Sequence, residues 1–127
     1  MGIGPITICP IKSGHATFLD LSPYGNVVKV VTPISQIQVI DIPKILEKIA
    51  ECESGGIHFD NNGQVIKGKI NPLDTGKYQI NLKYWGDEAR QLGYNLFTFE
   101  GNTLMALWIY EHYGTKPWSW SKDCWSK

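Results

Sequence analysis

The chain has 127 residues, a length that fits one domain or one small domain with an appended segment. Its 12 Lys and Arg residues balance its 12 Asp and Glu residues, so the net charge is zero and a basic patch for nucleic acid is not expected. No apolar run approaches the roughly 20 residues that span a bilayer, so we expect no membrane-spanning segment.

The first 41 residues predict a β-rich segment. Residues 16–21 and 27–32 are strand candidates, and the Pro- and Gly-containing residues 22–26 form the turn between them. Residues 34–40 are a third strand candidate. The segment is either the end of a β-rich binding module or a sheet that packs on the remainder of the chain.

A helix is expected from Ile42 to Glu53. Asp41 is its expected N-cap, and Gly55-Gly56 is its expected end. The apolar residues of this segment recur at helical spacing on one face: Ile42, Ile45, Leu46 and Ile49.

Turns and strands are expected after this helix. Residues 57–68 predict a hairpin, because Asn62-Gly63 is a strong turn signal. A further turn is expected at residues 74–76. This part of the chain therefore predicts a small β-structure between helices.

Two longer helices and one short helix are expected in the last third of the chain. The first covers about residues 83–92, and the second covers about 103–113 with Asn102 as its N-cap. A short helix is expected within residues 118–125. Together with the N-terminal strands, the pattern predicts an α+β fold.

Three cysteines, Cys9, Cys52 and Cys124, allow three different single disulfides. The three histidines show no metal-ligand spacing, so we expect neither a metal site nor a cofactor.

Two carboxylates carry the most specific chemical signal. Glu53 lies where the helix dipole is negative, which raises the pKa of a carboxyl group. Asp74 follows 21 residues later beside a glycine turn. Glycoside cleavage requires one protonated and one ionised carboxyl group, and this pair fits that requirement.

The sequences around both carboxylates resemble one superfamily. Asp74-Thr75-Gly76-Lys77-Tyr78-Gln79-Ile80-Asn81 is similar to the conserved pattern of animal-type lysozymes. Cys52-Glu53-Ser54-Gly55-Gly56 resembles the catalytic opening of resuscitation-promoting factors, and Glu53-Ser54 resembles that of lytic transglycosylases. The resemblance implies a lysozyme-like helical domain with a small β-hairpin over residues 42–127, preceded by the β-rich segment 1–41.

The resemblance also implies roles for single residues. Glu53 would be the general acid, and Asp74 would stabilise or attack the oxocarbenium-like state. Trp118 would form an apolar wall beside Glu53. A Cys52–Cys124 disulfide is implied as well, which leaves Cys9 either free or paired with a missing partner.

Five residues are candidates for binding the sugar. Gln79 and Asn81 lie on the same side if their segment is extended, and their amides either bond the sugar or stitch the fold together. Tyr113 and Trp118 are candidates for stacking on sugar rings. Ser54 is the fifth candidate; its alternative role is a bond to Glu53 or to the backbone.

The expected function is therefore that of a muramidase that cleaves β-1,4 MurNAc–GlcNAc bonds in peptidoglycan. We expect a monomer in the extracellular space or the cell envelope, although the first residues lack a signal sequence, so the chain is either cytosolic or begins after a removed signal or anchor. Two alternatives remain: a lytic transglycosylase that gives 1,6-anhydro products, and a wall-binding domain without catalytic turnover.

Overall fold

The computed structural model describes residues 17–20, 27–31 and 37–127, and these form an α+β fold, as the sequence predicts. The chain divides into two units, residues 1–43 and 44–127. This division falls two residues after the boundary set from the sequence.

The first unit contains an antiparallel sheet with the strand order β1-β2-β3, so its predicted β-rich character is confirmed. Thr17 lies opposite Val31, and Val27 lies opposite Asp41. The prediction that Asp41 caps the following helix is wrong, because Asp41 is the last residue of β3. The predicted turn at 22–26 lies outside the described residues. The strands are β1 (Thr17–Asp20), β2 (Val27–Val31) and β3 (Ile37–Asp41).

The second unit begins with α1 (Lys44–Ser54), which buries Leu46, Ile49 and Ala50. The helix starts two residues later than expected, because the chain is still extended at Asp41. At its other end, the N–H of Gly55 and of Gly56 donate to carbonyls of the last turns, each at 3.0 Å. This closure ends the helix just after Glu53, as the glycine pair predicts.

The expected hairpin at residues 57–68 is reduced to one isolated bridge, between Phe59 and Val65, and a second bridge joins Lys67 to Thr75. The side chain of Asp60 closes this turn, since its Oδ1 accepts from the N–H of Asn62 at 2.8 Å and of Gln64 at 2.9 Å. A side chain that takes backbone donors in this way competes with a regular strand ladder.

A two-stranded antiparallel sheet follows, made of β4 (Asp74–Thr75) and β5 (Ile80–Asn81). The turn occupies residues 76–79 between them, so Asp74 and Thr75 are strand residues and not turn residues. Asp74 lies directly opposite Asn81 in the register.

Helix α2 (Leu82–Leu92) runs from an Asn81 cap to Gly93, close to the expected bounds. Helix α3 (Phe99–Tyr113) starts four residues earlier than expected. Its N-cap is Thr98, whose hydroxyl accepts from the N–H of Gly101 at 3.0 Å. The prediction that Asn102 caps this helix is wrong, because Asn102 is fully buried inside it.

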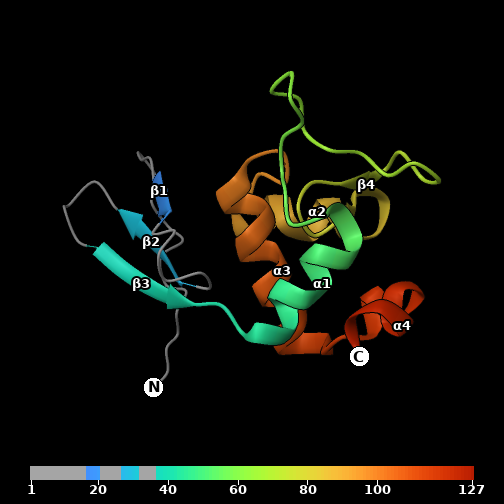
Figure 1. Ribbon diagram of the computed structural model, residues 1–127. Helices are drawn as coiled ribbons and strands as arrows, with labels where there is room; N and C mark the ends of the chain where they lie inside the picture. The colour runs from blue at the N-terminus through green and yellow to red at the C-terminus, as the bar shows by residue number, and fades with distance from the viewer. Residues whose placement is uncertain (1–16, 21–26, 32–36) are drawn as a thin grey trace. The chain divides into compact units, whose positions relative to one another are not determined.

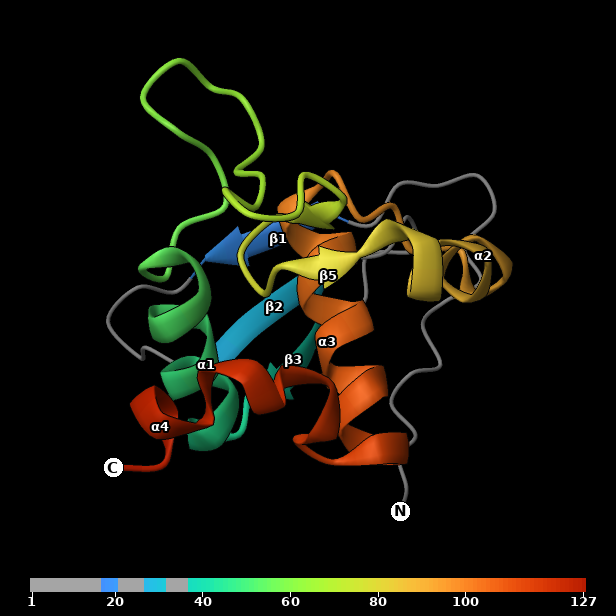
Figure 2. The same ribbon diagram turned by 90° about the vertical axis from the view of Figure 1, so that its right-hand side faces the viewer.

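The C-terminal segment forms a 3₁₀ helix, η3 (Lys116–Ser121), followed by α4 (Lys122–Trp125). Both pack against α1, and α1 also contacts α3 (Figures 1 and 2). Helix α3 is buried along most of its length, so it forms the centre of this unit. The buried apolar side chains of this core include Leu46, Ile49, Tyr78, Ile80, Met105, Ile109, Trp118 and Trp125.

Within the described residues, every helix is too short or too polar to cross a bilayer.

Candidate functional site

Glu53 lies in the last turn of α1 with a half-buried side chain. Its Oε1 accepts a 2.6 Å hydrogen bond from the hydroxyl of Ser121, the last residue of η3. Burial raises the pKa of Glu53 above its ordinary value of 4.5; the Ser121 bond opposes this rise, and the negative charge of Asp74 adds to it. The carboxyl group is therefore easier to protonate than an exposed glutamate, which is the property that a general acid needs.

The disulfide between Cys52 and Cys124 lies beside this contact, with the two Cα atoms 6.0 Å apart. Cys52 directly precedes Glu53, and Cys124 follows Ser121 by three residues. The bridge therefore ties together the two segments that supply the Glu53–Ser121 hydrogen bond. The pairing implied by the resemblance is confirmed, while Cys9 lies outside the described residues.

Asp74 is the first residue of β4, and its side chain is half-buried. Its Oδ1 accepts a 2.8 Å hydrogen bond from Nδ2 of Asn81 in the opposite strand. The Oδ1 of Asn81 in turn accepts from the N–H of Lys83 at 2.9 Å and of Tyr84 at 3.1 Å, which caps α2. Two roles were considered for Asn81, and these hydrogen bonds support the structural one. Asn81 also fixes the orientation of the Asp74 carboxylate.

Ser54 connects the end of α1 to the turn between β4 and β5. Its hydroxyl oxygen lies 2.7 Å from the carbonyl oxygen of Lys77 and 3.2 Å from that of Ala50. The expectation that Ser54 contacts substrate gains no support, because its single proton is directed at the backbone. Instead, this hydrogen bond holds the hairpin that carries Asp74 against the helix that carries Glu53.

Gln79 lies in the same turn with a φ of 48°, in the left-handed region. Its Nε2 donates to the carbonyl oxygen of Gly76 at 3.0 Å. The alternation with Asn81 that an extended segment would give does not apply here, because the chain turns at Gln79. Its half-buried amide stabilises the turn.

A buried amide that the sequence analysis did not assign to the site supports this turn. The Oδ1 of Asn102 accepts from the N–H of Tyr78 at 3.0 Å, and its Nδ2 donates to the carbonyl oxygens of Thr75 at 2.9 Å and Leu96 at 3.0 Å. A Cβ added at Gly76 would lie 2.4 Å from this Nδ2. Glycine is therefore required at this position by the close approach of α3, in addition to its φ of 77°.

His58 is a second residue near the site that was not predicted from the sequence, and only 4% of its surface is exposed. Its Nδ1 accepts from the N–H of Lys77 at 3.0 Å, so the proton is on Nε2, which donates to the carbonyl oxygen of Phe97 at 3.0 Å. The pKa of His58 is lowered, mainly because the ring is buried, so the neutral form is favoured. The ring is a structural link between the turn and the segment before α3.

Trp118 is a core residue, 4% exposed, and its indole N–H donates to the carbonyl oxygen of Tyr78 at 2.9 Å. The prediction that its ring contacts the substrate is not supported, because the ring is covered by the protein. Its carbonyl oxygen, however, lies 3.2 Å from the hydroxyl oxygen of Ser121, so Trp118 is connected to Glu53 through one side chain. Tyr113 is 51% exposed at the end of α3, where it packs edge-on against Trp85.

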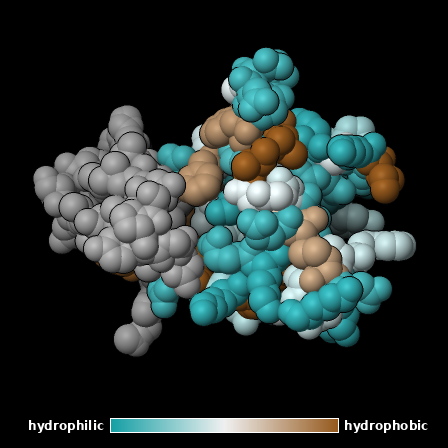
Figure 3. Space-filling model, viewed as in Figure 1, coloured by the Kyte–Doolittle hydropathy of each residue, from teal (hydrophilic) through white to brown (hydrophobic). Residues whose placement is uncertain are grey.

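Several exposed apolar side chains precede the strand that carries Asp74 in the sequence. They belong to the segment between α1 and β4, and brown patches over this segment are visible in Figure 3. The members are Ile57, Phe59, Ile70 and Leu73.

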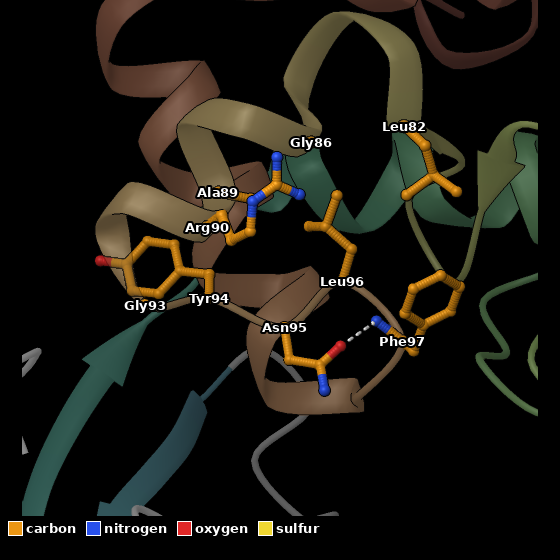
Figure 4. Close-up of a pocket in the computed structure, with 9 residues that line it drawn as sticks. All are labelled: Leu82, Gly86, Ala89, Arg90, Gly93, Tyr94, Asn95, Leu96 and Phe97. Carbon is orange, nitrogen blue, oxygen red and sulfur yellow. Dashed lines mark hydrogen bonds between the residues drawn. The ribbon is translucent and has the colours of Figure 1, made fainter. Parts of the chain in front are cut away.

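A pocket of about 330 Å³ lies at the C-terminal end of α2 and the loop that follows it (Figure 4). Leu82, Arg90, Tyr94 and Phe97 are among the residues that line it. Neither of the two carboxylates is among its lining residues, so this pocket is separate from the candidate site.

Three residues around the site were not predicted from the sequence, and they differ in whether their sequence context indicates a buried or bonded side chain. Asn102 precedes the mostly apolar run 103–109, and that context allowed two interpretations, a cap or a buried amide. His58 stands between two apolar residues, Ile57 and Phe59, but both of these are exposed in the structure, so its neighbours in sequence do not indicate that His58 is buried. Ser121 carries no such signal, because it is one of several serines in the C-terminal segment.

Comparison with known proteins gives no further assignment: no family model, no curated protein and no solved structure matches the chain. The functional interpretation therefore rests on the residues quoted from the sequence and on the geometry around Glu53.

Proposed function

We propose that residues 44–127 form a lysozyme-like glycoside hydrolase that cleaves β-1,4 MurNAc–GlcNAc bonds of peptidoglycan. The observation that carries the proposal is the environment of Glu53. Burial and the charge of Asp74 both raise its pKa, and Ser121 holds its carboxyl group in place. A protonated acid beside a second carboxylate is the arrangement that glycoside cleavage requires.

In the proposed reaction, Glu53 donates its proton to the glycosidic oxygen as the bond to the sugar breaks. Asp74, oriented by Asn81, stabilises the positive charge that develops on the sugar ring or forms a bond to it. Glu53, now ionised, then accepts a proton from the attacking water, and the product has a reducing end.

Digestion of peptidoglycan followed by mass analysis of the fragments tests this proposal. The hydrolase predicts fragments with reducing ends. Glu53→Gln should lower the rate by about 100- to 10,000-fold, the usual contribution of general acid catalysis. Glu51→Gln is the matched control, because Glu51 is an exposed glutamate in the same helix.

Asp74→Asn separates the two enzymatic mechanisms. A hydrolase that uses both carboxyl groups loses most of its activity in this variant. Near-normal rates with 1,6-anhydro products would identify a lytic transglycosylase, which uses a single glutamate. Binding of glycan without any cleavage, unchanged in Glu53→Gln, would overturn the enzymatic proposal and leave a wall-binding domain.

A further inference from the structure

The hydroxyl of Ser121 lies within hydrogen-bonding distance of two acceptors. Its oxygen lies 2.6 Å from Oε1 of Glu53 and 3.2 Å from the carbonyl oxygen of Trp118. A serine hydroxyl has one proton, so it donates to only one of these groups at a time. Because its oxygen also has lone pairs, it accepts a proton donor while it donates elsewhere.

These two contacts match the two states of Glu53. When Glu53 is ionised, Ser121 donates to its Oε1 over the short distance. When Glu53 is protonated, its O–H donates to the Ser121 oxygen, and the Ser121 proton turns to the carbonyl oxygen of Trp118. That carbonyl already accepts from the indole N–H of Trp125 at 3.0 Å, so it keeps a partner in both states.

We propose that Ser121 is a positioning residue for Glu53, which rests on the proposed function. Its hydroxyl rotates between Glu53 and the Trp118 carbonyl as Glu53 loses and regains its proton. No covalent bond of Ser121 breaks in this cycle: the proton that reaches the glycosidic oxygen comes from Glu53, and the proton that returns to Glu53 comes from water. Ser121 holds the carboxyl group in one orientation through both steps.

The rigidity of the surrounding structure supports this role. Segments η3 and α4 pack against α1, and the Cys52–Cys124 disulfide joins them beside the hydrogen bond. Residues on both sides of Ser121 therefore keep the oxygen in place while only the hydroxyl proton moves.

Among the polar and charged groups near Glu53, Ser121 is the one whose side chain forms a hydrogen bond with it. Asp74 is the charged group in the facing strand whose field acts on Glu53. In α3, the charge of Glu100 acts on His58. The remaining charged side chains on the segments packed against α1 are exposed: Glu111 and His112 in α3, Lys116 in η3, and Lys122 and Asp123 in α4.

The test compares Ser121→Ala and Ser121→Thr with a control, Ser119→Ala, which changes an exposed serine of the same 3₁₀ helix. The protonation of Glu53 is followed by NMR of ¹³C-labelled glutamate carboxyl groups, and kcat/KM is measured against pH on a soluble glycan oligomer. Loss of the Ser121 hydroxyl removes a bond that favours ionised Glu53. We expect Ser121→Ala to move the Glu53 midpoint and the alkaline limb of the profile upward by about one pH unit.

Ser121→Thr keeps a hydroxyl at the same position and should restore both midpoints to those of the unchanged protein, as should Ser119→Ala. A folded Ser121→Ala protein with the original Glu53 midpoint would overturn the inference, even if glycan is cleaved. Conversely, if the protein without substitutions cleaves no glycan, the proposed function is overturned. The NMR midpoint would still decide whether Ser121 controls the Glu53 proton.

Discussion

The neutral ring of His58 joins two segments of the fold. Its Nδ1 accepts from the N–H of Lys77, and its Nε2 donates to the carbonyl oxygen of Phe97. Both nitrogens of a protonated histidine are donors, so protonation breaks the bond to Lys77 and leaves a buried N–H without a partner.

This geometry predicts that the protein loses stability in mild acid. The pKa of His58 is lowered from its ordinary value of 6.5 in the folded protein. The unfolded chain therefore binds a proton first as the pH falls. The free energy of unfolding should be highest above about pH 6.5 and should decrease below it, toward the lower pKa of the folded state. Urea unfolding between pH 5 and pH 8 measures this dependence.

His58→Gln should remove this part of the pH dependence and lower stability by about 1–3 kcal/mol at neutral pH, because a buried donor loses its partner. His112→Gln changes an exposed histidine on α3 and should leave the pH dependence in place. Equal pH dependence in the unchanged protein and in His58→Gln would contradict the role assigned to His58.

At this scale, the sequence indicates candidate site residues more readily than it predicts the contacts of their side chains. Glu53 and Asp74 were identified because a carboxylate at a helix end and a second beside a turn are local patterns. The partner of Glu53 was not, because Ser121 reaches it from 68 residues further along the chain. A contact over that distance depends on how η3 packs, and no local pattern encodes it.

Among the elements, the helix that carries Glu53 and the C-terminal segment that carries Ser121 are joined covalently. The Cys52–Cys124 disulfide closes a loop with a sequence separation of 72 residues. On the chain-entropy model, a loop of this size stabilises the folded state by about 4 kcal/mol. The bridge also holds η3 and α4 against α1, where the Glu53–Ser121 hydrogen bond forms.

We therefore expect that Cys52→Ser combined with Cys124→Ser lowers the free energy of unfolding by up to about 4 kcal/mol. Chemical unfolding measures this loss, and reduction of the unchanged protein should produce the same effect. Cys9→Ser serves as the control, because it leaves the bridge intact. Unfolding curves that coincide for the double variant and the control would show that the bridge contributes little.

The elements show where local rules compete. Helix α2 agrees with its expected bounds because its cap, Asn81, and its end, Gly93, are both local signals. Helix α3 starts earlier than expected because Asn102 satisfies the preference rules for an N-cap and also those for a buried amide. Tertiary contacts decide between the two, since its amide bonds three backbone groups of the hairpin and its neighbours.

At the scale of the whole molecule, the candidate site belongs to one unit. Glu53, Asp74 and Ser121 all lie within residues 44–127, as does the disulfide. The three strands of the first unit pair with one another. The sequence predicted this sheet but gives no pattern that assigns a function to it.

A protein that contains only residues 42–127 should therefore fold, form the Cys52–Cys124 bridge and unfold in one cooperative transition. Its core, its disulfide and every hydrogen bond described around Glu53 remain present. If the proposed function holds, cleavage of short soluble glycans should match that of the full chain within about a factor of two, since Glu53, Asp74 and Ser121 are unchanged. If the first 41 residues serve to target the enzyme, binding to whole cell walls should fall in the shortened protein while this soluble activity persists. Circular dichroism, a free-thiol assay and rates on both substrates measure these properties. Loss of folding or of soluble turnover would instead make the β-rich segment a structural part of the enzyme.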